Sequence, residues 1–154
     1  MQRLLRWGAL ALTVYWCFFI WHFSLASASE SAATSGRFVG IFNEILADMG
    51  SDFRFSGTMV RKIAHFAEFA ILGFLCALTW RQHRFSHPVW LSFPVVITVA
   101  GIDELLQFTS PGRGPSVLDV LLDTAGGTCG ILAFALLTVL VLAIRARKIE
   151  KKQK

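Results

Sequence analysis

Three short segments carry ionisable residues inside otherwise apolar sequence, at spacings suited to chemistry. In the first segment, Lys62, His65 and Glu68 follow one another at intervals of three residues. At about 100° per helical residue, they stay within an arc of roughly 120° and share one helix face. The other two segments supply the remaining candidates: Asp103, Glu104 and Gln107, then Arg113, Ser116, Asp119 and Asp123.

These residue types are typical of a polar binding pocket. Lys62 and Arg113 would contact a phosphate or carboxylate group. The acids Glu68, Asp103, Glu104 and Asp119 would orient the two cations, and the other polar side chains, Gln107, Ser116 and Asp123, would complete the pocket. The leading hypothesis is therefore a site for a lipid headgroup or a cell-envelope precursor.

Catalysis is the alternative hypothesis for the same residues. His65 would act as a general base oriented by Glu68, and Arg113 would stabilise developing charge. Ser116 is the one nucleophile type in these segments, and a helix cap explains it better. An intramembrane hydrolase or transferase of a lipid-linked substrate would therefore use metal-activated water.

The charges of these segments do not balance. Five acids, Glu68, Asp103, Glu104, Asp119 and Asp123, stand against Lys62 and Arg113, an excess of three negative charges. A low-dielectric layer requires compensation, and protonation with ion pairing is the first expectation. A cationic ligand is one alternative. The other is a divalent metal held by His65, Glu68, Asp103 and Asp119, although the His-x-x-Glu spacing alone predicts no cofactor.

Four apolar runs contain or adjoin the three segments. They cover about 4–25, 60–80, 88–108 and 118–144, and each is long enough to cross a hydrocarbon core of about 30 Å. Hydrophobic residues make up 55% of the 154 residues, charged residues only 16%, and the mean hydropathy is +0.57. This predicts an all-α integral membrane protein, a single domain over residues 1–154 built as a bundle of four transmembrane helices.

Positive charge indicates the orientation of the bundle. Basic residues collect before the first run, between the second and third, and in a tail over residues 145–154. Both termini are therefore predicted to be cytoplasmic, which places all three polar segments in the outer half of the membrane. The competing interpretation is a cleaved signal peptide, because Ala26-Ser27-Ala28 resembles a cleavage site. The length of the first run and its Trp and Phe content favour an uncleaved helix.

The connections between the runs have patterns of their own. Residues 27–35 are small and polar and predict a flexible connector. Apolar residues then recur at helical spacing over 37–49, which predicts a short amphipathic helix in the outer interface, with a lid over the polar site as the alternative. Ser116 and Asp119 have capping-box spacing. Gly126 and Gly130 have the small-xxx-small spacing of close helix packing.

Taken together, these segments resemble the VanZ-like family of bacterial membrane proteins. The resemblance rests on Lys62-x-x-His65-Phe66-x-Glu68-Phe69, Asp103-Glu104-x-x-Gln107-Phe108, Arg113-x-x-Ser116-x-x-Asp119-Val120 and Asp123-x-x-Gly126, within about residues 60–130. Asp123 departs from the family pattern, which more often has Asn there. The resemblance implies a multi-pass protein of the bacterial inner membrane. The family's namesake is linked to glycopeptide (teicoplanin) resistance, which is not carried over to this chain.

Other functional classes fit the sequence less well. The net charge of +5 comes largely from the terminal tail, and without an accompanying aromatic or basic module it does not indicate nucleic-acid binding. The partners expected are membrane lipids or an envelope precursor. Polar residues confined to one half of the bundle give no continuous path for an ion conductor. The three cysteines all fall in apolar runs and are expected to be buried hydrophobes.

Overall fold

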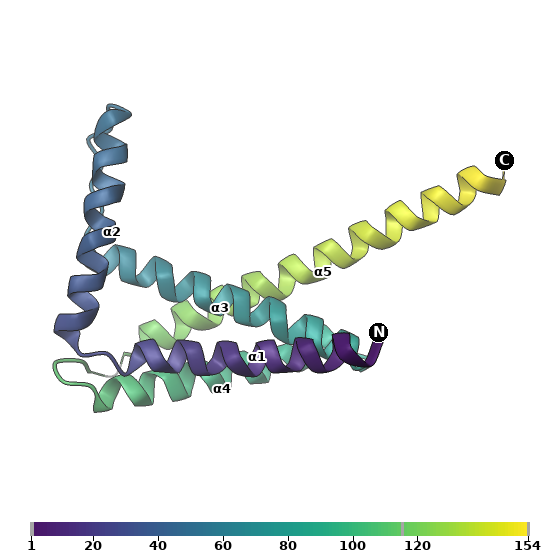
Figure 1. The fold of residues 1–154 in the computed structure, drawn as a ribbon, viewed down its shortest axis with the longest axis horizontal. Helices are drawn as coiled ribbons and strands as arrows, with labels where there is room; N and C mark the ends of the chain where they lie inside the picture. Colours follow the sequence, from purple (N-terminus) through teal and green to yellow (C-terminus); the bar gives the residue numbers. More distant parts are fainter. Residues whose placement is uncertain (1, 115, 154) are drawn as a thin grey trace.

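The computed structural model describes residues 2–114 and 116–153, and its regular elements in these ranges are all helices. They are α1 (Gln2–Ser24), α2 (Ala28–Asp48), α3 (Gly57–Gln82), α4 (Pro88–Thr109) and α5 (Val117–Gln153). Within the described ranges α1, α3, α4 and α5 are long and apolar enough to cross a membrane. The predicted class, a helical membrane protein with four spans, is confirmed (Figure 1).

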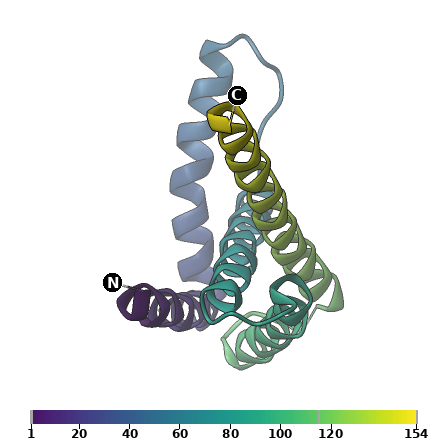
Figure 2. The same cartoon turned by 90° about the vertical axis from the view of Figure 1, so that its right-hand side faces the viewer.

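Helix α3 is the centre of the bundle. It contacts α1, α2, α4 and α5, as the end-on view shows (Figure 2). The apolar core lies where α1, α3, α4 and α5 meet and contains Ile20, Phe69, Leu72, Cys76, Val96, Val99, Ala100 and Ile131. Helix α4 continues through Pro94 from Pro88 to Thr109. The central position of α3 means that any polar side chain on its inner face meets several helices at once.

Glycines allow the backbones of α3 and α5 to touch. A Cβ atom added at Gly130 would lie 1.8 Å from the carbonyl oxygen of Ala70, and one at Gly126 would lie 2.3 Å from that of Phe66. Heavy atoms that do not bond to each other cannot approach so closely. The predicted role of Gly126 and Gly130 in helix packing is confirmed.

Helix α2 begins earlier than predicted. Residues 27–35 are not a flexible connector, because α2 starts at Ala28. Ser27 is the N-cap, and it forms a capping box with Glu30: the Ser27 hydroxyl accepts from the backbone N–H of Glu30 at 3.3 Å, and the Glu30 carboxylate accepts from the backbone N–H of Ser27 at 2.8 Å. The reciprocal bonds satisfy N–H groups that the first helical turn leaves free, so this polar stretch becomes helical.

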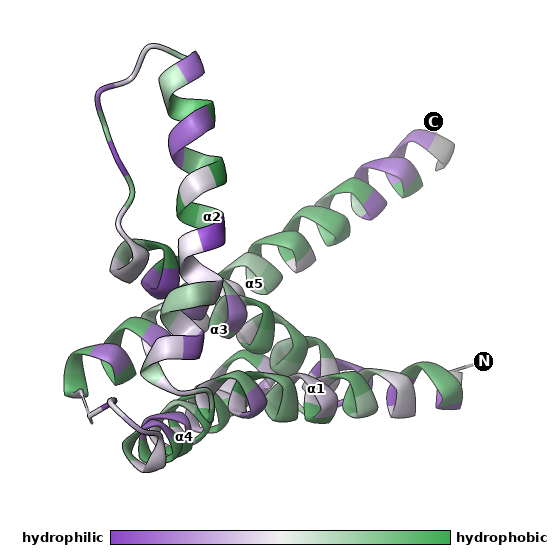
Figure 3. Ribbon diagram, turned by 60° about the vertical axis from the view of Figure 1, so that its left-hand side comes forward, coloured by the Kyte–Doolittle hydropathy of each residue, from purple (hydrophilic) through white to green (hydrophobic). Residues whose placement is uncertain are grey.

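Helix α2 runs across the direction of α1, at the end of the bundle where α1 finishes (Figure 1). Hydrophilic and hydrophobic residues alternate along it (Figure 3). Its apolar side chains, including Phe38, Ile41 and Ile45, remain about half exposed, so the other helices of the bundle do not cover them. Asn43 fixes the returning chain by accepting from Phe55 N–H at 2.7 Å and donating to its carbonyl at 3.2 Å.

The capping box makes the start of α2 sensitive to pH. Hydrogen bonds from Ser27 hold the pKa of Glu30 below its ordinary value of 4.5. A carboxylate with a lowered pKa stabilises the helix fully above the ordinary value, and loses this effect as pH falls through the lowered pKa. We expect amide protection in the first turn of α2 to drop over that acidic range. Hydrogen exchange measures it, and Glu30→Gln should abolish the pH dependence; an unchanged profile in this variant would contradict the prediction.

Helix α5 is longer than a membrane span. Its 37 residues extend about 55 Å at 1.5 Å per residue, so the helix continues beyond the predicted span into the hydrophilic tail (Figure 3). Lys154, the last residue of the basic tail, lies outside the described residues. Cys76 is buried and Cys17 half-buried, but the expectation of burial is wrong for Cys129, which lies on the outer surface of α5.

Arginines gather at the end of the bundle away from the polar segments. A shallow hollow there is lined by Arg6, Arg81, Arg84 and Arg145, together with Leu5 and Gln82. These four arginines come from the N-terminal segment, the region joining α3 to α4, and the start of the basic tail. The fold thus brings together in space the positive charges that were separate in sequence.

Candidate functional site

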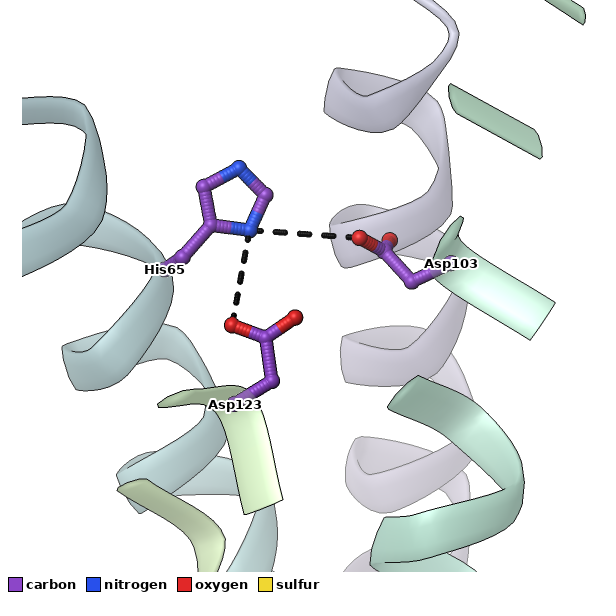
Figure 4. Close-up of side chains that lie close together, drawn as sticks. All are labelled: His65, Asp103 and Asp123. Carbon is purple, nitrogen blue, oxygen red and sulfur yellow. Dashed lines mark ion pairs between the residues drawn. The ribbon is translucent and has the colours of Figure 1, made fainter. Parts of the chain in front are cut away.

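Three helices place one polar side chain each at a common point. His65 lies on α3, Asp103 on α4 and Asp123 on α5. The Nδ1 atom of His65 is 3.9 Å from Asp103 Oδ2 and 3.8 Å from Asp123 Oδ1 (Figure 4). The α3 and α5 segments are near helix starts and the α4 segment is near a helix end, so antiparallel packing brings them to one level.

Asp103 is the most constrained member of this group. Its side chain is fully buried, and Oδ1 accepts a hydrogen bond from Ser24 Oγ at 2.5 Å while Oδ2 accepts one from Gln107 Nε2 at 2.8 Å. Ser24 closes α1, so all four membrane-spanning helices contribute to the site. Sequence reasoning missed Ser24, because a serine at the end of an apolar run carries no signal of its own.

Asp123 is equally buried but lacks a comparable partner. Its relative exposure is 1%, and Oδ1 accepts no hydrogen bond from the described residues. This oxygen points at His65 Nδ1 across a gap too wide for a hydrogen bond (Figure 4). A buried carboxylate oxygen without a donor is costly, and such an atom calls for an explanation.

The start of α5 is held by a cap shared between two helices. Ser116 Oγ accepts from the backbone N–H of Asp119 at 3.3 Å, as the capping-box spacing predicted. The backbone N–H of Ser116, however, donates to the side chain of Glu104 on α4, not to Asp119. Asp119 instead lies 3.3 Å from Lys62 Nζ. Ser116 and Glu104 thus have a structural role in joining α4 to α5.

Arg113 does not line the pocket. In the turn between α4 and α5, its Nη1 donates to the carbonyl oxygens of Ser24 and Ala26, at 3.0 and 3.5 Å. Burial lowers the pKa of Arg113, and the charge of Arg61 lowers it further, while nearby acids oppose both effects. Arg113 therefore tethers the end of α1 to this turn. Pro115, in the same connection between α4 and α5, lies outside the described residues.

A small pocket opens beside His65. Its lining residues are Arg61, Lys62, His65, Gln107, Asp119, Leu122 and Asp123. No residue of α2 belongs to this lining, so the structure gives no support to α2 as a lid. Arg61 was not among the predicted site residues, because it lies off the i, i+3 face formed by Lys62, His65 and Glu68. The i, i+4 spacing of Arg61 and His65 was the available signal.

Glu68 lies one turn deeper on α3. Its side chain is half-buried, and its charge interacts with those of Asp103 and Asp123. The backbone carbonyl of Glu68 accepts a hydrogen bond from Trp16 Nε1 at 2.9 Å, which links α1 to α3. The structure thus groups His65 and Asp103 with Asp123, while Glu68 and Asp119, the other metal ligands considered from sequence, lie outside this triad.

The fold and the site together define a helical membrane protein whose spans bury a polar layer near one end. The model of the VanZ/LLP1 family matches residues 9–138, most of the chain. This protein belongs to that family, as the motifs indicated, and the match extends beyond them into α1. Comparison with curated proteins and with solved structures finds no match.

Proposed function

We propose that this membrane protein binds the anionic group of a cell-envelope lipid or lipid-linked precursor in the pocket beside Arg61. The observation that carries the proposal is the state of Arg61. It lines the pocket, is half-buried, and has no ion-pair or hydrogen-bond partner among the described residues. Its planar guanidinium offers five donors in a fork that matches phosphate and carboxylate groups.

Three further lining residues, Lys62, Gln107 and Leu122, fit this role. Lys62 adds a second positive charge beside Arg61 and is kept in place by Asp119. Gln107 supplies an amide on the far wall, and Leu122 gives the pocket an apolar side. An amphiphile with a charged head and a hydrocarbon chain presents the same combination of polar and apolar surface. A lipid ligand therefore suits the pocket better than a small water-soluble anion.

The orientation that we propose places this pocket on the outer side of the bacterial inner membrane, with both termini in the cytoplasm. Support comes from the arginine-lined hollow at the opposite end, because basic residues flanking membrane spans are retained on the cytoplasmic side. Envelope precursors are exposed on the outer side, where the pocket would meet them.

Replacing Arg61 with glutamine should weaken binding of an anionic lipid by roughly ten- to a hundredfold, since a hydrogen bond to a charged group contributes roughly 1.5–3 kcal/mol. The protein in nanodiscs is titrated with phosphatidylglycerol and, separately, with a polyprenyl phosphate, and bound lipid is counted by native mass spectrometry. The lipid that binds with the higher affinity identifies the source of the anionic group.

Arg54→Gln is the matched control. Arg54 lies on the same predicted side of the membrane, but among the described residues its guanidinium donates to the nearby carbonyls of Ser51 and Phe53 and lines neither the pocket beside Arg61 nor the arginine-lined hollow. Binding should remain at the wild-type level in this variant. Equal affinity of the Arg61 and Arg54 variants for both lipids would contradict the proposed function.

A further inference from the structure

We propose that His65, Asp103 and Asp123 bind one divalent transition-metal ion. Each residue offers one ligand atom, and the three atoms lie within 4.8 Å of one another. They come from α3, α4 and α5, so the ion would join three membrane-spanning helices. This proposal does not depend on the lipid ligand proposed above: His65 and Asp123 also line the pocket, but Arg61, which carries that proposal, is not a metal ligand here.

The unpartnered oxygen of Asp123 is the first argument. It is buried, accepts no hydrogen bond, and is directed at the same imidazole nitrogen as Asp103 Oδ2 (Figure 4). Hydrogen bonding between Nδ1 and both oxygens is excluded by separations of 3.8 and 3.9 Å. A cation among the three atoms gives each of them a partner. To form metal–ligand bonds of about 2.0–2.2 Å, the three atoms need to approach one another by only a few tenths of an ångström to about 1 Å.

The second argument is the support around Asp103. Hydrogen bonds from Ser24 and Gln107 hold its carboxylate and leave Oδ2 facing His65. Both donors favour the ionised carboxylate, the form that binds a metal. Second-shell donors of this kind are typical of ligating carboxylates, which they orient toward the ion.

Charge balance is the third argument. With Arg61 included, the polar layer contains five acids, Glu68, Asp103, Glu104, Asp119 and Asp123, against three bases, Arg61, Lys62 and Arg113. When all are ionised, two negative charges are left over, which is the amount that one divalent cation neutralises. Charges in a low-dielectric interior must be compensated.

The ligand types narrow the choice of ion. Mg²⁺ and Ca²⁺ prefer sites made entirely of oxygen atoms. One imidazole nitrogen with two carboxylate oxygens suits Zn²⁺ or a similar first-row ion. Three protein ligands also leave a coordination position for water or a ligand group, as open zinc sites do. That position would face the pocket lined by Lys62 and Gln107.

The test measures metal binding by the full-length protein in detergent, after chelator treatment and without added lipid. Titration with Zn²⁺ should show one ion bound per chain, and Co²⁺ should give the intense visible absorption of a site with few ligands. Asp123→Asn keeps the side-chain volume but removes the charged ligand, and should weaken Zn²⁺ binding at least tenfold. His65→Gln should have an effect at least as large.

Two variants serve as controls for the titration. Asp48→Asn removes an exposed acid at the end of α2, and His87→Gln removes an imidazole at the start of α4; both should bind Zn²⁺ as the wild type does. A wild-type protein that binds no stoichiometric ion would overturn the proposal. So would an Asp123→Asn protein that elutes as a folded monodisperse species and keeps wild-type affinity. If the Asp123→Asn protein loses metal binding but still binds the anionic lipid, the metal site and the anion pocket act separately.

Discussion

Replacing Gly130 with alanine is expected to destabilise the bundle by roughly 2–3 kcal/mol, the upper part of the range for overpacked interiors. The added Cβ would lie 1.8 Å from the carbonyl oxygen of Ala70 on α3. Because the obstructing atom belongs to the backbone, no side-chain rotation relieves the clash. Helices α3 and α5 must separate, which weakens the largest interface of the bundle.

Unfolding by increasing sodium dodecyl sulfate in mixed micelles, followed by tryptophan fluorescence, measures this loss. Gly101→Ala is the matched control, since a Cβ added at Gly101 on α4 meets no atom within 4 Å. That substitution should be neutral or slightly stabilising, because alanine favours the helix over glycine. Similar destabilisation by both variants would mean that helix packing at Gly130 is not the cause.

Replacing Asp103 with alanine is expected to cost about 3 kcal/mol or more. The substitution removes the acceptor of both the Ser24 hydroxyl and the Gln107 amide, in a place that is fully buried. Each buried donor left unsatisfied costs roughly 1–3 kcal/mol. The helices α1 and α4 also lose a direct connection, since Ser24 and Asp103 lie on different helices.

The variant Asp103→Asn distinguishes the contribution of these hydrogen bonds from that of the negative charge of Asp103. The amide keeps the volume and one good acceptor, so the loss of stability should be well below that of the alanine variant in the same assay. In metal-free protein, Asp123→Asn should behave in the opposite way and leave stability unchanged or raised, because it removes an unpartnered buried carboxylate. Equal losses for Asp103→Ala and Asp103→Asn would contradict the role given to the hydrogen bonds.

The proposed anion pocket and the proposed metal triad share a common wall. Lys62 and Asp119 line the pocket only, while His65 and Asp123 belong to both groups. A metal ion bound by the triad would add a further positive charge near a phosphate held by Arg61. If both proposals hold, Zn²⁺ should strengthen binding of the anionic lipid, and the Asp123→Asn variant should lose this enhancement.

One local signal was present in the sequence but was misinterpreted. Ser27 and Glu30 have the spacing of a capping box, yet Ser27 also belongs to the apparent signal-peptide cleavage site, and both residues lie in a stretch of small polar residues. Composition therefore favoured a flexible connector. The helix forms because reciprocal hydrogen bonds at its start outweigh the weak helix preference of serine and threonine.

The sequence by itself determined the four membrane spans, the common level of the polar residues and the role of Gly126 and Gly130 in close helix packing. These features depend on hydropathy and periodicity, which are properties of neighbouring residues. Only the tertiary structure decided that Asp123 faces His65, that Arg113 binds the end of α1, and that Arg61 lines the pocket. Those placements depend on how each helix is rotated about its axis and how closely it approaches its neighbours. Contacts between residues far apart in the chain determine both.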